Sequence, residues 1–230
     1  MELGAELARA LGDRPFRFYP AVLSTEADAL AWARAGGPGG AVVTAGYQVS
    51  PRGRAGFEWD VGKGLAFSLL LRPKLPAARE GWLYTVAVSG LADVLGEDVT
   101  IHWPDQVRFG GERLGAVGVH AEPGPVDVDW AVVNVLVEQA DPELVARIVE
   151  AIETRLAAAT ASVLAAYLRR CETIGQSVVA RLVPLGPGGP EVSGKAVSSS
   201  LDGSLVIETA EGRRMAVPPQ SLGVLEQPPP

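Results

Sequence analysis

Two arginines separated by one glycine are the residues of this sequence best suited to binding an anion. Arg52 and Arg54 stand in a glycine-rich stretch, residues 46–59, that follows an apolar, β-branched segment and ends in an indole. Guanidinium groups on a closely approaching loop match phosphate and carboxylate oxygens in pairs. An indole at Trp59 could stack on a purine. A solvated surface loop is the alternative, and this cluster alone does not decide between the two.

A second cluster follows, as Val99-Thr-Ile-His-Trp-Pro-Asp-Gln106 and then Arg113-Leu-Gly-Ala-Val-Gly-Val119. His102 could act as an acid or a base, but a histidine inside a strand is more often packed and hydrogen-bonded. The other histidine, His120, has no metal-ligand partner at a suitable spacing, so we interpret it as structural.

In this order, the two clusters resemble those of biotin protein ligases. The family pattern runs Gln-x-x-Gly-Arg-Gly-Arg-x-Gly-x-x-Trp, then Lys-Trp-Pro-Asn-Asp, then Lys-Leu-x-Gly-Ile. The resemblance extends along most of the chain. Ser24-Thr25 stands where the family has its Ser-Thr-Asn start, and Gly194-Lys-Ala-Val with Asp202-Gly-Ser-Leu-Val is similar to the family's terminal barrel. The ordered set is specific, whereas each piece alone is not.

The resemblance implies a ligase that joins the biotin carboxylate to ATP, with Mg²⁺, and then lets a lysine of a carrier protein attack the biotinyl-adenylate. Such a site must hold two anions together and shield the adenylate from water. By resemblance Arg113 and Arg54 are the catalytic residues, because Arg113 replaces the family's lysine and Arg54 grips the anion. The implied ligand-binding residues are Ser24, Thr25 and Gln48 toward biotin, Arg52 and Gly53 toward the carboxylate and phosphate, Trp59 over the adenine, and Ala116 and Asn134 along the pocket.

Several of these positions depart from the family pattern. Arg113 keeps the charge of the lysine that it replaces, but its side chain is bulkier and planar. The stretch from His102 to Gln106 loses a cation and moves its carboxylate by one position. Pro51 and Ala116 stand where the family has pocket glycines. The segment that matches the family's Gly-x-Gly-Ile-Asn reads Asn134-Val-Leu136-Val-Glu138, so two more glycines are replaced. Because such glycines let a ligand approach the backbone, we expect a narrowed or blocked cavity.

Three functions therefore remain open. The first is an adenylate-forming ligase for biotin or a related carboxylic acid. The second is a catalytically impaired ligase-fold protein that acts as a binding or interaction module. The third is an enzyme of the lipoyl or octanoyl transferase type, because a short pocket would favour a slim acyl chain over a bicyclic ring.

The apolar pattern predicts an α+β fold. Residues 25–35 have the spacing of an amphipathic helix, residues 41–47, 65–71, 99–103, 114–119 and 128–137 read as buried strands, and a helix of about thirty residues, broken once, begins at Pro142. We expect a mixed sheet packed with helices, of the class II synthetase and biotin ligase type, over residues 1–174. A small SH3-like β-barrel is expected over 175–226, with a tail at 227–230.

Composition narrows the class of protein further. The formal charge of −7 opposes general binding to nucleic acid, and only about fifteen residues precede Phe16, too few for a helix-turn-helix domain. The single cysteine, Cys171, is interpreted as a structural thiol rather than a nucleophile. No run of eighteen apolar residues and no signal sequence occurs, so we expect a cytoplasmic protein away from membranes. A homodimer is compatible with exposed sheet edges.

Overall fold

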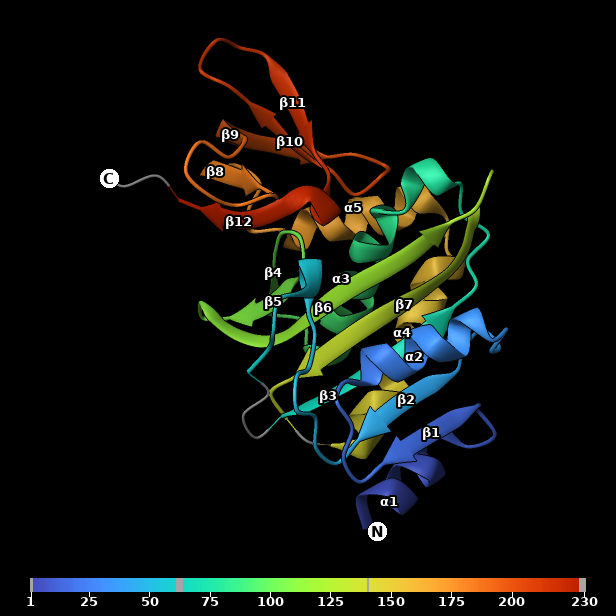
Figure 1. The fold of residues 1–230 in the computed structure, drawn as a ribbon. Helices are drawn as coiled ribbons and strands as arrows, with labels where there is room; N and C mark the ends of the chain where they lie inside the picture. Colours follow the sequence, from blue (N-terminus) through green and yellow to red (C-terminus); the bar gives the residue numbers. More distant parts are fainter. Residues whose placement is uncertain (1, 61–63, 140, 228–230) are drawn as a thin grey trace.

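Two β-sheets make up the framework, with helices around the larger one (Figure 1). The computed structural model describes residues 2–60, 64–139 and 141–227. Along the chain the elements are α1 Glu2–Leu11, β1 Phe16–Tyr19, α2 Thr25–Arg34, β2 Val42–Ala45, η1 Arg54–Gly56, β3 Leu65–Leu71, η2 Ala77–Arg79, α3 Trp82–Leu95, β4 Thr100–His102, β5 Gln106–Phe109, β6 Glu112–Pro123, β7 Val128–Val137, α4 Pro142–Ala157, α5 Thr160–Arg170, β8 Ser177–Leu182, β9 Glu191–Ser199, β10 Leu205–Glu208, β11 Arg214–Val217, η3 Pro219–Ser221 and β12 Leu222–Glu226.

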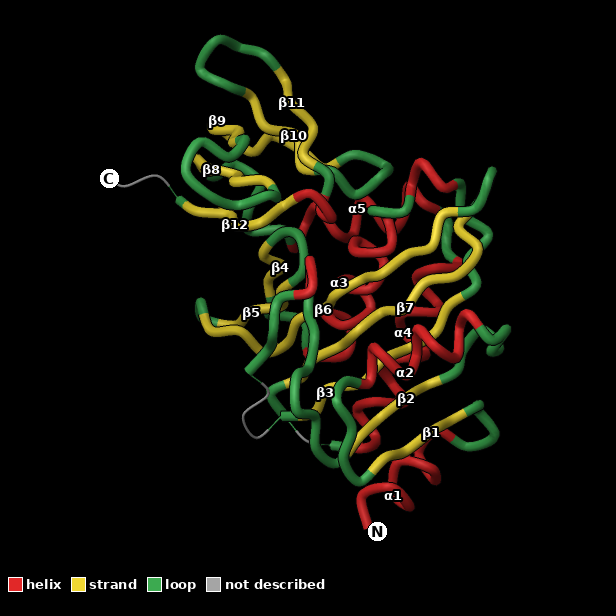
Figure 2. Tube along the Cα trace, in the orientation of Figure 1, coloured by secondary structure: helices red, strands yellow, loops and turns green. Residues whose placement is uncertain are grey.

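The larger sheet is mixed, in the order β1-β2-β3-β7-β6-β5-β4. Strands β1 and β2 are parallel, and the other neighbours are antiparallel. Strands β3 and β7 have the bounds that the apolar pattern predicts. The loop that joins β2 to β3 leaves the sheet, runs up toward β12 and returns (Figure 2), so a segment far from the C-terminus in sequence lies close to it in space.

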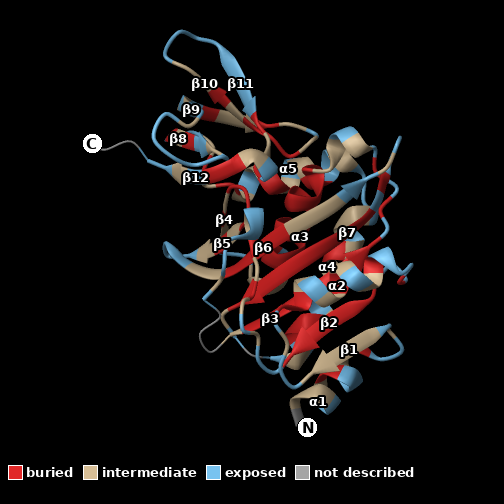
Figure 3. Cartoon of the chain, in the orientation of Figure 1, coloured by how far each residue is buried: buried red, intermediate tan, exposed pale blue. Residues whose placement is uncertain are grey.

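Alternate residues of the central strands face two different layers, as the period of a strand requires. Phe67 and Leu69 of β3 point into the main core, which also contains apolar residues of α1, α3 and α4. Leu70 packs in a smaller cluster with Ala29 and Ala33 of α2. Both faces of the central strands are therefore buried (Figure 3). Helix α2 covers only part of its face, and the loop between β2 and β3 crosses the remainder.

Two helix predictions are confirmed. Helix α2 begins at Thr25, where the Ser24 side chain accepts a hydrogen bond from the Glu26 backbone N–H at 3.2 Å. The long helix from Pro142 is broken once, between α4 and α5, at residues 158–159. Helix α3 was not expected. Most of its residues are buried, so it carries no polar face whose periodicity would reveal a helix.

The C-terminal sheet is antiparallel, in the order β11-β10-β9-β8-β12. The turn between β9 and β10 contacts the rest of the molecule through two hydrogen bonds. The Trp103 indole, in the β4–β5 turn, donates to the Gly203 carbonyl at 3.1 Å, and Arg79 Nε, at the end of η2, donates to the Leu201 carbonyl at 2.9 Å. The predicted α+β fold with a mixed sheet followed by a small all-β unit is confirmed. The boundary at 174/175 and the SH3-like character of the barrel stay predictions.

None of the helices in the described residues combines the length and the apolarity that crossing a membrane requires.

Candidate functional site

The candidate site lies on the face of the larger sheet that α2 covers only in part. Strand register places Ala66, Leu136 and Ala116 in one row across β3, β7 and β6. The next row on the same face joins Ser68, Asn134 and Gly118 in the same way. Alternation along each strand turns all these residues away from the main core. Two predicted ligand-binding positions, Ala116 and Asn134, therefore share this face.

A continuous polar network fills the space between α2 and the second row. Gln48 Oε1 accepts hydrogen bonds from the Thr25 backbone N–H at 2.8 Å and from its hydroxyl at 3.1 Å. Ser68 Oγ lies 2.9 Å from Thr25 Oγ1 and donates to Asn134 Oδ1 at 2.7 Å. Asn134 Nδ2 in turn donates to Glu26 Oε1 at 2.9 Å. Residues expected to contact a ligand thus contact one another.

The first row forms an apolar floor beneath the glycine-rich loop. Ala66, Ala116 and Leu136 are buried together, and Trp59 packs against them from above. The Trp59 indole also lies directly against Gly53, where any side chain would collide with it. The loop itself rests on β6, because a Cβ atom added to Gly118 would lie 2.7 Å from the Gly53 carbonyl carbon. Gly53 and Trp59 are therefore together at the site, and Leu136 occupies space that a glycine would leave open.

Arg54 ties this loop to two other parts of the molecule. Its Nε donates to Asp105 Oδ2 at 3.0 Å, and its terminal nitrogens donate to the carbonyls of Leu222 and of Gly223, the latter at 3.2 Å. The side chains of Arg54 and Asp105 are only 11% and 10% exposed. Burial raises the pKa of the Asp105 carboxyl, and the charge of Arg54 opposes that rise. In this arrangement Arg54 bridges the loop to β12 instead of facing the apolar floor.

The other two predicted cations lie nearer the surface. Arg52 donates to the Gly56 carbonyl within its own loop at 3.0 Å. Arg113, at the start of β6, forms an ion pair with Glu138 at 2.9 Å, in which both side chains are about one third exposed. Arg113 Nη2 also lies 3.5 Å from the Asp60 carbonyl. The structure therefore does not bring the three arginines together around one point.

An open cavity of about 420 Å³ lies beside the floor, where β2 runs into the glycine-rich loop and β3 begins. Tyr47, Gln48 and Trp59 line it, and so do the carboxylates of Glu58 and Asp60. The lining residues that the structure describes include no lysine, arginine or histidine. Among the described residues, this cavity therefore offers no basic side chain to an anion.

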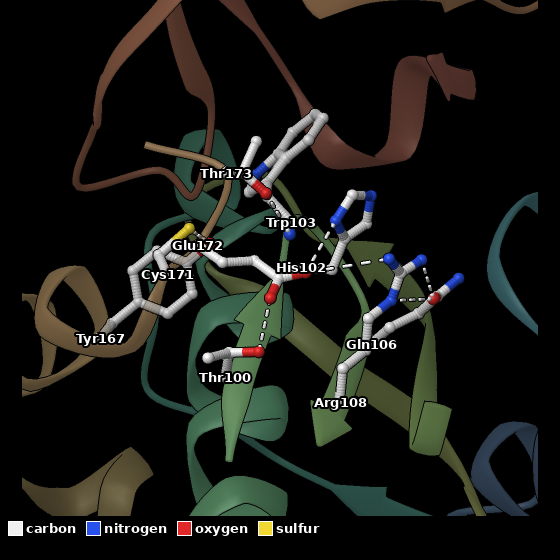
Figure 4. Close-up of polar contacts among 9 residues, drawn as sticks. All are labelled: Thr100, His102, Trp103, Gln106, Arg108, Tyr167, Cys171, Glu172 and Thr173. Carbon is white, nitrogen blue, oxygen red and sulfur yellow. Dashed lines mark hydrogen bonds and ion pairs between the residues drawn. The ribbon is translucent and has the colours of Figure 1, made fainter. Parts of the chain in front are cut away.

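A second cluster connects the β4–β5 hairpin to the residues that follow α5 (Figure 4). Glu172 accepts from the Thr100 hydroxyl at 2.5 Å, lies 3.2 Å from His102 Nδ1 and 3.7 Å from Arg108. Burial, followed by the charge of Arg108, lowers the pKa of His102, against the opposing effect of Glu172. A cavity of about 240 Å³ between the two sheets is lined by His102, Arg108 and Glu172. This agrees with a packed, hydrogen-bonded His102.

Cys171 has the structural role expected of it. The thiol is buried and contacts the Tyr167 hydroxyl at 3.5 Å (Figure 4). Burial raises the pKa of the Cys171 thiol, which disfavours the reactive thiolate.

The residues described form no metal-binding cluster of their own for the Mg²⁺ that the resemblance implies. No group of three or more His, Cys, Asp or Glu side chains among them could hold a metal ion. In the stretch that matches the family's Lys-Trp-Pro-Asn-Asp, the carboxylate of Asp105 is paired with Arg54, and the next residue, Gln106, is neutral. We therefore derive no step through a metal at this site.

Several residues at the site escaped sequence reasoning. Ser68 and Glu26 complete the polar network, and Asp105 and Glu138 pair with the two arginines assigned to catalysis. One of them gave a signal, because Ser68 is a polar residue in the middle of the apolar strand β3. A hydroxyl buried at such a position must find a partner.

Solved structures resemble this fold, although no family model and no curated protein matches the sequence. The chain is similar to a biotin protein ligase from Aquifex aeolicus in complex with biotin and ATP, with a TM-score of 0.68 and 20% identity over 93% of this chain and 99% of that one. It is also similar to the biotin acetyl coenzyme A carboxylase synthetase from Helicobacter pylori with bound biotinylated ATP, with a TM-score of 0.64 and 20% identity over 89% of this chain and 100% of that one.

A third similar structure is a biotin protein ligase-like protein of unknown function from a Silicibacter species. Its TM-score is 0.64 and its identity 16%, over 88% of this chain and 94% of that one. Likeness at this level of identity establishes the fold. The chain has the fold of biotin protein ligases, as the residue clusters predict.

Proposed function

We propose that the protein is a biotin protein ligase-like enzyme, which joins a carboxylic acid to ATP as an acyl-adenylate and passes the acyl group to a lysine of a carrier protein. One observation carries the proposal. Residues that the family pattern assigns to the ligand come from separate segments, yet they meet on one face of one sheet. They are Thr25, Gln48, Trp59, Ala116 and Asn134.

The roles proposed for these residues are those that the family resemblance implies. Ser24, Thr25 and Gln48 would bind the acid. Biotin is the first candidate, because one similar structure contains biotin and ATP and another contains biotinylated ATP. Trp59 would cover the adenine from above the floor. Arg113 would hold the carboxylate and phosphate oxygens, after exchanging its present partner for the ligand. Arg54 is the less accessible of the two catalytic candidates, because its partners lie in β12 and at Asp105.

Pyrophosphate release tests the proposal directly. The purified protein is incubated with ATP, Mg²⁺ and, separately, biotin, lipoate or octanoate. We expect release with at least one acid, and we expect it to fall by at least about a hundredfold in Arg113→Ala, which loses a charge-stabilising donor. Arg147→Ala, on the exposed side of α4, is the matched control and should retain activity. Absence of release with all three acids removes the ligase proposal.

A second function has its own supporting observation. The side chains of Thr25, Gln48 and Asn134 form hydrogen bonds with other residues of the protein, and Glu138 neutralises the charge of Arg113. A site closed in this way suits a catalytically impaired ligase-fold protein that binds a partner. Calorimetry with biotin and ATP separates the two functions, because ATP-dependent biotin binding in the micromolar range or tighter would contradict the impaired protein.

Two further expectations stay proposals. We place the boundary between a ligase-like unit and a C-terminal barrel at 174/175, which limited proteolysis would test. A homodimer through an exposed edge of the larger sheet would be tested by sedimentation, since β1 and β4 stand at its two edges.

A further inference from the structure

A cavity with three basic side chains lies at the opposite end of β3 from the candidate site. It holds about 430 Å³ of space, and residues of the stretches 39–40, 71–82 and 153–160 line it. Leu71 stands at this end of β3, and Leu65 lines the other cavity, about 20 Å away at the usual rise per residue of a strand. We infer that this cavity binds a phosphate monoester: a phosphate group on a small organic body.

The charge of the lining supports an anion. The segment that follows β3 contributes three basic side chains to it: Arg72, Lys74 and Arg79. None of the three is paired with a carboxylate of the described residues. Of the lining residues, Glu153 is acidic, but Arg14 already donates to its two oxygens at 2.8 and 2.9 Å. In a chain of net charge −7, the cavity is therefore a local excess of positive charge.

Arg79 has hydrogen-bond donors that no described residue uses. Its Nε donates to the Leu201 carbonyl at 2.9 Å, and its guanidinium carbon lies 5.5 Å from the centre of the Trp82 ring. These contacts hold the group in place without neutralising its charge. Nη2 is buried and has no acceptor, which is costly for a charged donor. Two oxygens of one phosphate would supply acceptors for both terminal nitrogens of Arg79.

Arg72 and Lys74 add two further positive charges. Arg72 donates from Nε to the Gly37 carbonyl at 2.9 Å and from Nη2 to the Ala33 carbonyl at 3.1 Å. Carbonyl groups fix this guanidinium but leave its charge uncompensated. Lys74 is exposed, and an ammonium group on a flexible stem can reach a phosphate oxygen. The three charges together favour a doubly charged phosphate over a singly charged carboxylate.

The rest of the lining suits an organic body. It is largely apolar and includes Leu75, Pro76, Trp82, Leu156 and Ala157. Pro76 and Ala157 are exposed, so part of this apolar surface is open to a ligand. The volume of about 430 Å³ lies within the usual range of small-molecule sites, roughly 300–1,000 Å³. A bare phosphate ion would leave most of it empty.

Nuclear magnetic resonance of the ¹⁵N-labelled protein tests the binding without ATP or biotin. The backbone N–H signals of Gly40 and Thr160 report on this cavity, and the Gly53 signal reports on the candidate site. The probes are phenyl phosphate and inorganic phosphate at pH 7.5. Phenol and benzoate are the uncharged and the singly charged controls.

Two pairs of variants test the basic side chains. Lys74→Gln is compared with Lys195→Gln, which removes the same charge from an exposed position on β9. Arg79→Gln is compared with Arg147→Gln on the exposed side of α4. Arg79→Gln also removes the hydrogen bond to Leu201, so Lys74→Gln, at an exposed position, carries the test if that variant does not fold.

We expect phenyl phosphate to shift the Gly40 and Thr160 signals in a saturable way, and to bind more tightly than inorganic phosphate because the apolar lining contacts the ring. Phenol and benzoate should leave both signals unchanged. Lys74→Gln should weaken binding by about three- to fivefold, the range of an exposed ion pair. Arg79→Gln should weaken it by at least about tenfold, because a hydrogen bond to a charged group is stronger. The two control variants should bind as the natural chain does.

Any of three results would overturn the inference: no saturable shift at Gly40 and Thr160, phenyl phosphate binding no tighter than benzoate or inorganic phosphate, or equal affinities in Lys74→Gln and Lys195→Gln. A shift at Gly53 alone would place the anion at the candidate site instead. The inference does not rest on the proposed function, because pyrophosphate release is measured with other reagents and depends on residues at the other end of β3.

Discussion

Breaking the Arg54–Asp105 pair from either side should have different consequences, and the difference depends on pH. Asp105→Ala leaves the Arg54 guanidinium buried without its counter-charge, and breaking a buried pair typically costs about 3–5 kcal/mol. Arg54 retains the Leu222 and Gly223 carbonyls as acceptors. We therefore expect Asp105→Ala to lose about 3 kcal/mol of unfolding free energy, the lower end of this range. This loss should change little between pH 5 and pH 7.5.

Arg54→Met instead leaves the Asp105 carboxylate buried without its partner. A carboxylate in this position can become neutral by binding a proton. The pKa of Asp105 is already raised by burial against the opposing charge of Arg54, so it rises further in the variant. The stabilisation from a neutral Asp105 is complete below the unfolded pKa and is lost as pH rises through the folded pKa. The free energy of unfolding that Arg54→Met loses relative to the natural chain should therefore be larger at pH 7.5 than at pH 5. The difference is about 1.4 kcal/mol for each unit by which the variant raises the pKa of Asp105 within this pH range.

Urea unfolding at the two pH values measures these differences. Arg113→Met is the matched control, because its pair with Glu138 is about one third exposed on each side and should be worth no more than about 1 kcal/mol. Equal deficits for Arg54→Met and Arg113→Met at both pH values would refute the argument. So would a deficit for Arg54→Met that grows as the pH falls.

Two other substitutions and one test of cysteine reactivity follow from contacts elsewhere in the molecule. Ser68→Ala removes the hydroxyl that joins the polar network and should cost about 1–3 kcal/mol of unfolding free energy; a loss under about 0.5 kcal/mol in urea unfolding would contradict it. Leu136→Gly opens the apolar floor, should cost about 2–5 kcal/mol, and should raise biotin affinity in calorimetry, where unchanged affinity would show that Leu136 does not block the site. Cys171, buried and with a raised pKa, should react with a disulfide reagent at pH 8 at least about tenfold more slowly in the folded protein than in urea; equal rates would place the thiol in solvent.

The sequence predicts those parts of the fold that depend on local pattern. Strand β3 is a short apolar run, and its bounds follow directly from the residues. The Asp141 cap and Pro142 fix the start of α4 in the same way. Helix α3 cannot be predicted in this way, because it is apolar on nearly all sides and lacks the 3.6-residue pattern by which a helix is recognised. Burial on every side removes the signal that the prediction needs.

At the site, the family resemblance implies ligand-binding residues but not their partners. Thr25, Gln48 and Asn134 are among the residues that it implies, and in the structure they lie in one hydrogen-bonded network. The interactions of Arg54 with Asp105 and Gly223 join positions 51 and 169 residues apart. Such pairings depend on how the two sheets dock, which no local spacing specifies.

Two substitutions relative to the family pattern place a carboxylate beside an arginine. Asp105 and Glu138 both stand where the pattern has asparagine, and each pairs with an arginine assigned to catalysis. A ligand phosphate must displace a carboxylate before it can reach either guanidinium. Of the two, Arg113 is the easier to release, because its pair with Glu138 is partly exposed, whereas Asp105 is buried with Arg54. Glu138→Asn should therefore tighten pyrophosphate binding, by up to about fivefold in calorimetry. Unchanged affinity would mean that the paired carboxylate does not compete with an anion at this site.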